Sequence, residues 1–115
     1  MDIKSRDHQS VVVFDIDGEI TISTMPQPTL HQVIKDELER GKRDILLDLK
    51  KVDFIDSFGI GELLASYVST QNLGGKLKLC SVSKKLFLLF QITRLVTVLE
   101  IYEDCDRALK SFGTP

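Results

Sequence analysis

The chain has 115 residues, of which 43% are apolar and 28% charged, and its formal net charge is −2. This composition is typical of a soluble globular domain, and a chain of this length buries roughly two-thirds of its unfolded surface on folding. The sequence shows no clustered basic face of the kind that binds nucleic acid. The longest apolar runs, such as Leu86–Phe90, are far shorter than the ~20 residues that cross a bilayer. We therefore expect one domain over residues 1–115, with no nucleic-acid partner and no membrane insertion.

The N-terminus and the cysteines indicate the cellular compartment. No charged start followed by an apolar stretch and a cleavage site marks the chain for secretion. Cys80 and Cys105 lack metal-ligand spacing and form no CxxC motif. These features predict a reduced, cytoplasmic protein in which both cysteines are core residues and not reactive thiols. We expect no bound metal and no cofactor.

The first third of the chain carries strand patterns. Residues 1–7 are mostly polar and indicate a weak edge strand or a loose start. Ser10–Ile16 is rich in β-branched residues and predicts a strand, and the Asp17-Gly18 pair that follows is a turn signal. Glu19–Ser23 alternates apolar and polar residues, which is typical of a half-buried strand. The two predicted strands form either a hairpin or a bulged continuation.

A helix and a buried strand come next. Pro26 and Pro28 interrupt regular pairing and precede a helical apolar spacing over Thr29–Arg40, with Gly41 as a natural C-cap. Asp44–Leu49 is an apolar run of strand length, the pattern of a central strand that is covered on both faces.

The clearest helix pattern begins within the stretch Val52–Gly61 and ends near Asn72 and the Gly74-Gly75 pair. Its expected buried face consists of the positions that repeat at helical spacing, namely Ile60, Leu63, Leu64, Tyr67, Val68 and Gln71.

Three elements follow in the last third of the chain. Lys76–Val82 alternates as a strand does, Lys84–Thr93 predicts a short helix, and Val96–Tyr102 predicts a last strand. Asp104 can cap a final helix. The Lys84–Thr93 helix is apolar on most sides, so it is either buried all round or exposes a patch for docking or for a weak homodimer contact.

The order β-β-α-β-α-β-α-β-α predicts an α/β fold, a mixed and mostly parallel sheet of about five strands with about four helices. Loops that follow parallel strands lie at one edge of such a sheet, which is where these folds bind their ligands. The loop Lys50–Asp56 is one of them.

Two stretches carry candidate functional residues. The first, Val11–Ile20, resembles the opening motif of haloacid-dehalogenase-like phosphatases, which implies Asp15 as nucleophile and Asp17 as acid/base. Glu19 stands where that family has Thr or Val, and a third carboxylate would repel a phosphate substrate. No later Gly-Asp-x-x-x-Asp arrangement follows. The alternative is a strand whose outward side chains are acidic.

The second stretch is Asp56-Ser57-x-Gly59-x-Gly61, which follows an apolar strand and precedes the strand sequence GGKLKLCSVS by about one helix. This arrangement resembles the STAS domain family, and within it the bacterial anti-sigma-factor antagonists. The resemblance covers most of the chain and is strongest from Ile45 to Phe112.

The resemblance implies a function in transcription regulation by partner switching. The unphosphorylated chain would bind an anti-sigma factor that is also a serine kinase, through Asp56, Ser57, Phe58, Gly59 and Gly61. Phosphorylation of Ser57 would release that partner, and a serine phosphatase would restore binding. ATP and magnesium would belong to the kinase, and the chain itself would not be an enzyme. A STAS scaffold or transporter-associated module without a phospho-switch is the alternative.

The residues themselves are compatible with this role. Ser57 is a candidate N-cap or first-turn residue, and the simpler interpretation is that it only caps the helix. Ile60 stands where a capping box needs Glu or Gln. Gly59 and Gly61 each cost a helix up to ~1 kcal/mol relative to Ala. We expect them to allow either close approach of a partner or tight packing inside the fold.

Overall fold

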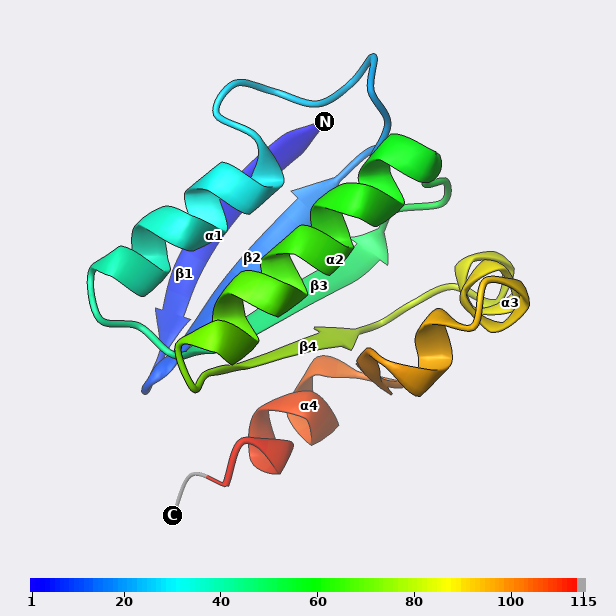
Figure 1. The fold of residues 1–115 in the computed structure, drawn as a ribbon. Helices are drawn as coiled ribbons and strands as arrows, with labels where there is room; N and C mark the ends of the chain where they lie inside the picture. Colours follow the sequence, from blue (N-terminus) through cyan, green and yellow to red (C-terminus); the bar gives the residue numbers. More distant parts are fainter. Residues whose placement is uncertain (114–115) are drawn as a thin grey trace.

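The computed structural model describes residues 1–113 as a single five-stranded sheet with helices on both faces (Figure 1). The strand order in the sheet follows the chain order, and β1 is antiparallel to β2 while the remaining neighbours are parallel. The elements are β1 (Asp2–His8), β2 (Val11–Asp17), α1 (Leu30–Glu39), β3 (Asp44–Lys51), α2 (Ser57–Asn72), β4 (Lys76–Cys80), α3 (Lys84–Ile92), the 3-10 turn η1 (Leu95–Thr97), β5 (Glu100–Tyr102) and α4 (Cys105–Ser111). The predicted mixed α/β architecture is confirmed.

Two hydrophobic cores lie on opposite faces of the sheet. Val12, Phe14 and Ile16 of β2 point into the larger core beneath α1, α2 and α3. Val11 and Val13 point into a smaller core under α4. This alternation explains why the start of β2 is apolar at every position: side chains of a strand point to opposite faces in turn, and here both faces are covered.

The hairpin of the sheet lies one element earlier than predicted. β1 pairs with β2 along its whole length, from Asp2 opposite Asp17 to His8 opposite Val11. The predicted strand Glu19–Ser23 is wrong. Gly18 adopts φ +110, a conformation open to glycine, and turns the chain out of the sheet. The backbone then folds into a turn in which Met25 donates to the carbonyl of Thr21 at 3.0 Å.

The last predicted strand is also shorter than expected. Val96–Tyr102 divides into η1 and the three-residue β5, and only β5 pairs with β4. The NH of Leu99 donates to the carbonyl of Leu95 at 2.8 Å, so this part of the chain is helical and both leucines face the core. Residues four apart lie on the same side in a helix and in a strand. The apolar positions Leu95 and Leu99 therefore do not distinguish the two structures.

The buried face of α2 differs from the predicted one. Gly59, Leu63, Ser66 and Thr70 are its buried positions, whereas Val68 is exposed. The Ser66 and Thr70 hydroxyls donate to the carbonyls of Glu62 and Ser66, four residues earlier, at 2.7 and 2.8 Å. Two polar side chains are therefore buried at little cost, because the helix backbone satisfies them.

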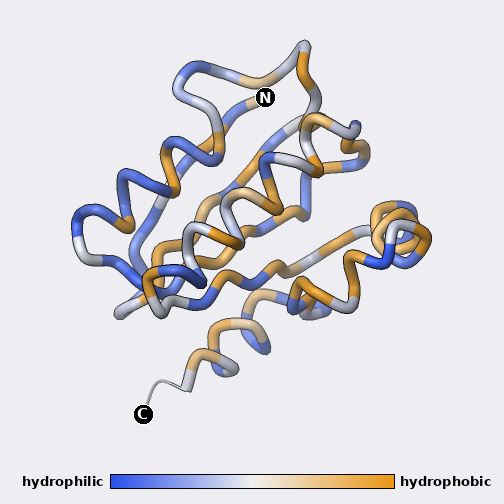
Figure 2. The backbone as a smooth tube through the Cα atoms, viewed as in Figure 1, coloured by the Kyte–Doolittle hydropathy of each residue, from blue (hydrophilic) through white to orange (hydrophobic). Residues whose placement is uncertain are grey.

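The short helix α3 is neither fully buried nor fully exposed. Leu86 and Phe90 pack into the larger core, whereas Phe87, Leu88 and Ile92 are exposed. Figure 2 shows this helix as the most continuous apolar coil at the periphery of the fold. Part of the apolar excess seen in the sequence therefore faces outward. Among residues 1–113, no helix is long and apolar enough to cross a membrane.

Candidate functional site

The N-terminus of α2 lies at the edge of the sheet where the parallel strands end (Figure 1). Five residues, 52–56, connect the end of β3 to Ser57, the first residue of α2. Val52 and Ile55 of this connection are buried and fix its path, while Asp53 and Phe54 are exposed. The loop before α2 therefore lies at the predicted binding edge of the sheet. Val52 and Ile55 anchor it there, and the two residues between them stay exposed.

A second segment braces the connection. The NH of Ile20 donates to the carbonyl of Phe54 at 3.0 Å, and the NH of Asp56 donates to the carbonyl of Ile20 at 3.2 Å. Ile20 is itself fully buried and forms an isolated bridge with Ile55. The turn after β2 and the loop before α2 are therefore one structural unit, although more than thirty residues separate them in the chain.

Asp56 is the N-cap of α2. Its Oδ1 accepts from the NH of Gly59 at 2.8 Å, and its Oδ2 accepts from the NH of Ile22 at 3.0 Å. These backbone donors, Gly59 first, hold the pKa of Asp56 below its usual value because they stabilise the ionised carboxylate. Both oxygens of Asp56 thus have structural partners.

This arrangement corrects the simpler interpretation of Ser57. Ser57 is the first residue of the helix and not its N-cap, so its hydroxyl does not cap α2. The side chain is exposed, and no hydrogen bond of its hydroxyl is present within the described residues 1–113. The Ser57 hydroxyl is therefore accessible from solvent and free of structural bonds within the described residues.

The two glycines of the motif have different surroundings. Gly59 is buried, and a Cβ there would collide with the carbonyl oxygen of Ile20 and lie 2.7 Å from Cγ2 of Ile55. Tight packing inside the fold, one of the two expected reasons, accounts for Gly59. Gly61 is exposed, and a Cβ there would meet nothing within 4 Å. No internal contact requires Gly61 to be a glycine.

Two exposed apolar side chains lie on the segments that adjoin the start of α2. Ile22 is 70% exposed and adjoins Asp56 through its backbone, and Phe54 in the connecting loop is 42% exposed. Lys85 at the start of α3 lies with its Nζ 6.0 Å from the centre of the Phe54 ring. We call Ile22, Phe54, Ser57, Phe58 and Gly61 the α2 surface. In the sequence, Ile22 is one apolar position of the predicted strand Glu19–Ser23 and Phe54 is one apolar residue of the predicted loop Lys50–Asp56, and no further signal marks either residue.

The residues of the phosphatase-like motif lie elsewhere, on β2. Asp15 is paired with Arg6 of β1, with 2.8 Å between Nε and Oδ2. Asp17 is exposed, and both aspartates line a surface cavity of about 290 Å³ that also contains Lys4, Lys50 and Lys51, among other residues. The side chain that would act as nucleophile is therefore the partner of a cation, at the end of a strand whose outward positions are charged.

Comparison with known proteins agrees with this description. The model of the STAS domain matches residues 2–108. The anti-sigma-B factor antagonist of Listeria monocytogenes is 34% identical, over 88% of this chain and 86% of that protein. A crystal structure of an anti-sigma factor antagonist from Mycobacterium paratuberculosis has a TM-score of 0.82 at 25% identity, covering 96% of this chain and 92% of the other. The phosphorylated form of the Bacillus cell fate determinant SpoIIAA has a TM-score of 0.73 at 18% identity, covering 96% and 99%, and shares the fold. The chain belongs to the STAS domain family.

Proposed function

We propose that this chain is an anti-sigma-factor antagonist, a protein-binding module that a phosphate on Ser57 switches off. The observation that carries the proposal is the exposed Ser57 hydroxyl at the start of α2, where Asp56 already provides the cap. The names of the relatives support the class of partner, because the similar Listeria protein is an anti-sigma-B factor antagonist. The unphosphorylated α2 surface binds the anti-sigma factor, and the sigma factor is then released.

The switch acts through local electrostatics. Phosphorylation adds a charge of about −1.5 to −2 at Ser57. In the free protein the N-terminus of α2 offsets this charge by ~1 kcal/mol, while the neighbouring carboxylate of Asp56 opposes it. In the docked complex the phosphate would lie within the α2 surface, to which the exposed side chains Ile22 and Phe54 also belong. Removing such an anion from water without a matching cation costs several kcal/mol, so binding is lost while the fold is kept.

The partners divide the chemistry among them. The anti-sigma factor is also the serine kinase and supplies ATP and magnesium, and a serine phosphatase removes the phosphate from Ser57. This chain binds and is modified, is not an enzyme, requires no cofactor, and acts in the cytoplasm, with residues 1–115 as one domain. The remaining motif positions have supporting roles: Asp56 and Gly59 hold the start of α2 in place, and Gly61 keeps the surface beside Ser57 flat.

The experiment starts from a pull-down in the native host, with the purified chain as bait. The captured ATPase is purified and incubated with the chain and ATP, and the site of modification is read by mass spectrometry. The expected result is one phosphate, on Ser57, and loss of complex on a sizing column after phosphorylation. Ser57→Ala is the control and should stay unmodified and bound. An unmodified Ser57, or a phosphate on another residue, would refute the switch.

A further inference from the structure

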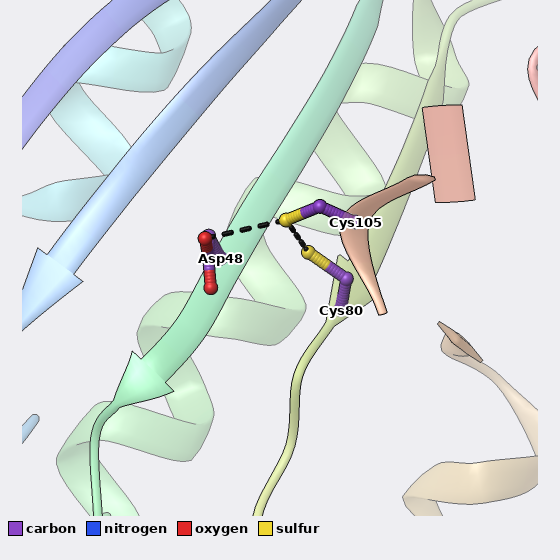
Figure 3. Close-up of side chains that lie close together, drawn as sticks. All are labelled: Asp48, Cys80 and Cys105. Carbon is purple, nitrogen blue, oxygen red and sulfur yellow. Dashed lines mark hydrogen bonds between the residues drawn. The ribbon is translucent and has the colours of Figure 1, made fainter. Parts of the chain in front are cut away.

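Two cysteines that are far apart in the chain lie in contact on the face of the sheet covered by α4. Cys80 is the last residue of β4 and Cys105 is the first residue of α4. Their Sγ atoms are 2.6 Å apart, and the thiol of Cys105 donates to Oδ2 of Asp48 on β3 at 3.2 Å (Figure 3). Both cysteines are free. The α2 surface plays no part in this cluster.

The fold holds this contact from several sides. Asp48 and Cys80 are register partners in the parallel pairing of β3 with β4. Asp104 caps α4 by accepting from the NH of Arg107 at 2.8 Å, which fixes the helix start that carries Cys105. Cys80 packs in the smaller core with Ala108 of α4. The two sulfur atoms are thus brought together by packing.

We propose that Cys80 and Cys105 form a reversible disulfide when the chain meets a small-molecule disulfide such as oxidised glutathione. The bond would tie the start of α4 to the end of β4 and close the segment between them, which contains α3, η1 and β5. The site makes the chain responsive to thiol oxidation in addition to its proposed control at Ser57.

The order of the reaction follows from exposure. Cys80 is 0% exposed, whereas Cys105 is half-buried and lines a surface cavity together with Arg6, Lys50 and Ser81, among other residues. The Cys105 thiolate attacks the small disulfide, forms a mixed disulfide and releases one thiolate. Cys80 then loses its proton and attacks the Cys105 sulfur, and the second small thiol leaves. Two protein thiols and one small disulfide become one protein disulfide and two small thiols.

Burial slows the exchange of the two thiols with a small disulfide. Burial raises the pKa of the Cys80 thiol far above its usual value and raises that of Cys105 as well, and the carboxylate of Asp48 adds to both effects. Only the thiolate attacks, so the raised pKa values keep the pair reduced during brief exposure to an oxidant. Sustained oxidation is needed, which suits a response to a lasting change in redox conditions.

A bound zinc ion fits the same residues less well. Two thiolates at about 2.3 Å from a tetrahedral zinc lie ~3.7 Å apart, so this pair would have to spread. Asp48 supplies a third ligand atom within the cluster, and the adjoining cavity is lined by the cations Arg6 and Lys50 as well as by Asp104 and Asp106. A disulfide needs the sulfur atoms to approach by a fraction of an ångström and needs no third ligand.

The test uses the full chain, first reduced and then incubated with oxidised glutathione. The mass of the denatured intact chain is measured after free thiols are alkylated. The expected product is a monomer that has lost two hydrogen atoms, is not alkylated and returns to the dithiol on addition of dithiothreitol. Closing this segment of the chain should also raise Tm by on the order of 10 °C.

Two variants test the assigned order. Cys80→Ala should accumulate one glutathione on Cys105, because nothing resolves the mixed disulfide. Cys105→Ala should stay unmodified, because Cys80 is buried. The proposal is overturned if the wild-type chain keeps two alkylatable thiols, carries two glutathiones or forms only dimers linked between chains. It is also overturned if Cys105→Ala reacts as fast as Cys80→Ala.

Discussion

Ile22 and Asp56 are 34 positions apart in the chain, and the NH of Ile22 donates to Oδ2 of Asp56 at 3.0 Å. The other oxygen of Asp56 accepts from Gly59 and caps α2. One carboxylate therefore joins the turn after β2 to the helix that presents Ser57. The geometry of the α2 surface depends on this bond, because it holds the exposed Ile22 against Asp56, the residue before the exposed serine.

Replacing Asp56 with Ala should loosen this junction. The variant loses the cap and leaves the NH groups of Gly59 and Ile22 without their acceptor, so Tm should fall by several degrees. Asp56→Asn keeps one side-chain oxygen that can still cap the helix, and its loss should be smaller. Thermal unfolding followed by circular dichroism measures both. Equal Tm values for the wild type and Asp56→Ala would show that the carboxylate has no structural role.

The contribution of Asp56 should depend on pH in a defined direction. Its pKa is lowered in the folded state, so its stabilising effect is fully present above the unfolded pKa of about 4 and is lost as the pH falls through the lowered folded value. Urea unfolding of the wild type and of Asp56→Asn, from pH 7 down to about pH 2, measures this effect. The two unfolding midpoints should converge at acidic pH, and a gap that stays constant would contradict the assignment.

The two glycines of the motif should respond oppositely to alanine. Gly59→Ala places a Cβ against the carbonyl of Ile20, which is backbone and cannot move freely, and should cost about 1–3 kcal/mol of stability. Gly61→Ala meets no atom within 4 Å and improves helix propensity, so it should stabilise the free chain by up to ~1 kcal/mol. Urea unfolding midpoints measure both changes, and a similar loss for the two variants would refute the difference in packing.

A negative charge at Ser57 should weaken partner binding without unfolding the chain. Ser57→Asp should lower the affinity for the anti-sigma factor by about tenfold or more, while Ser57→Ala should bind like the wild type. Ser10→Asp adds the same charge to the exposed turn between β1 and β2, at the other end of β2, and serves as the control. Isothermal titration measures the affinities. Equal weakening by Ser10→Asp would mean that net charge, and not the position, decides binding.

The apolar residues around Ser57 should contribute to affinity. Phe54→Ala should weaken the complex by about tenfold, because exposed aromatic residues at the centre of an interface are frequent hot spots. Val68→Ala is the matched control, since Val68 is also exposed but lies on α2 itself, beyond the first turns of the helix. Both variants should keep the wild-type Tm. If Val68→Ala weakens binding as much as Phe54→Ala does, the partner contacts the length of α2 and not its N-terminus.

The sequence by itself determined the mixed α/β class, the order of strands and helices from residue 29 onward, and the position of Ser57 between a buried strand and a helix. These conclusions rest on local periodicity, which a single stretch of chain displays without its neighbours. It also separated the Ser57 motif from the acidic strand end at Asp15 and Asp17. The hydroxyl was recognisable because the spacing Asp56-Ser57-x-Gly59-x-Gly61 lies between a strand pattern and a helix pattern and resembles the STAS motif.

Only the tertiary structure decided the finer assignments. Whether Gly59 is needed depends on Ile20, and the second partner of the Asp56 carboxylate is Ile22, and both come from a different part of the chain. The predicted strand at Glu19–Ser23 failed because the backbone there bonds to the loop before α2 and not to a neighbouring strand. The contact of Cys80 with Cys105 likewise has no local signal. Such features arise from contacts between residues distant in sequence, and local patterns do not encode which distant segment supplies the partner.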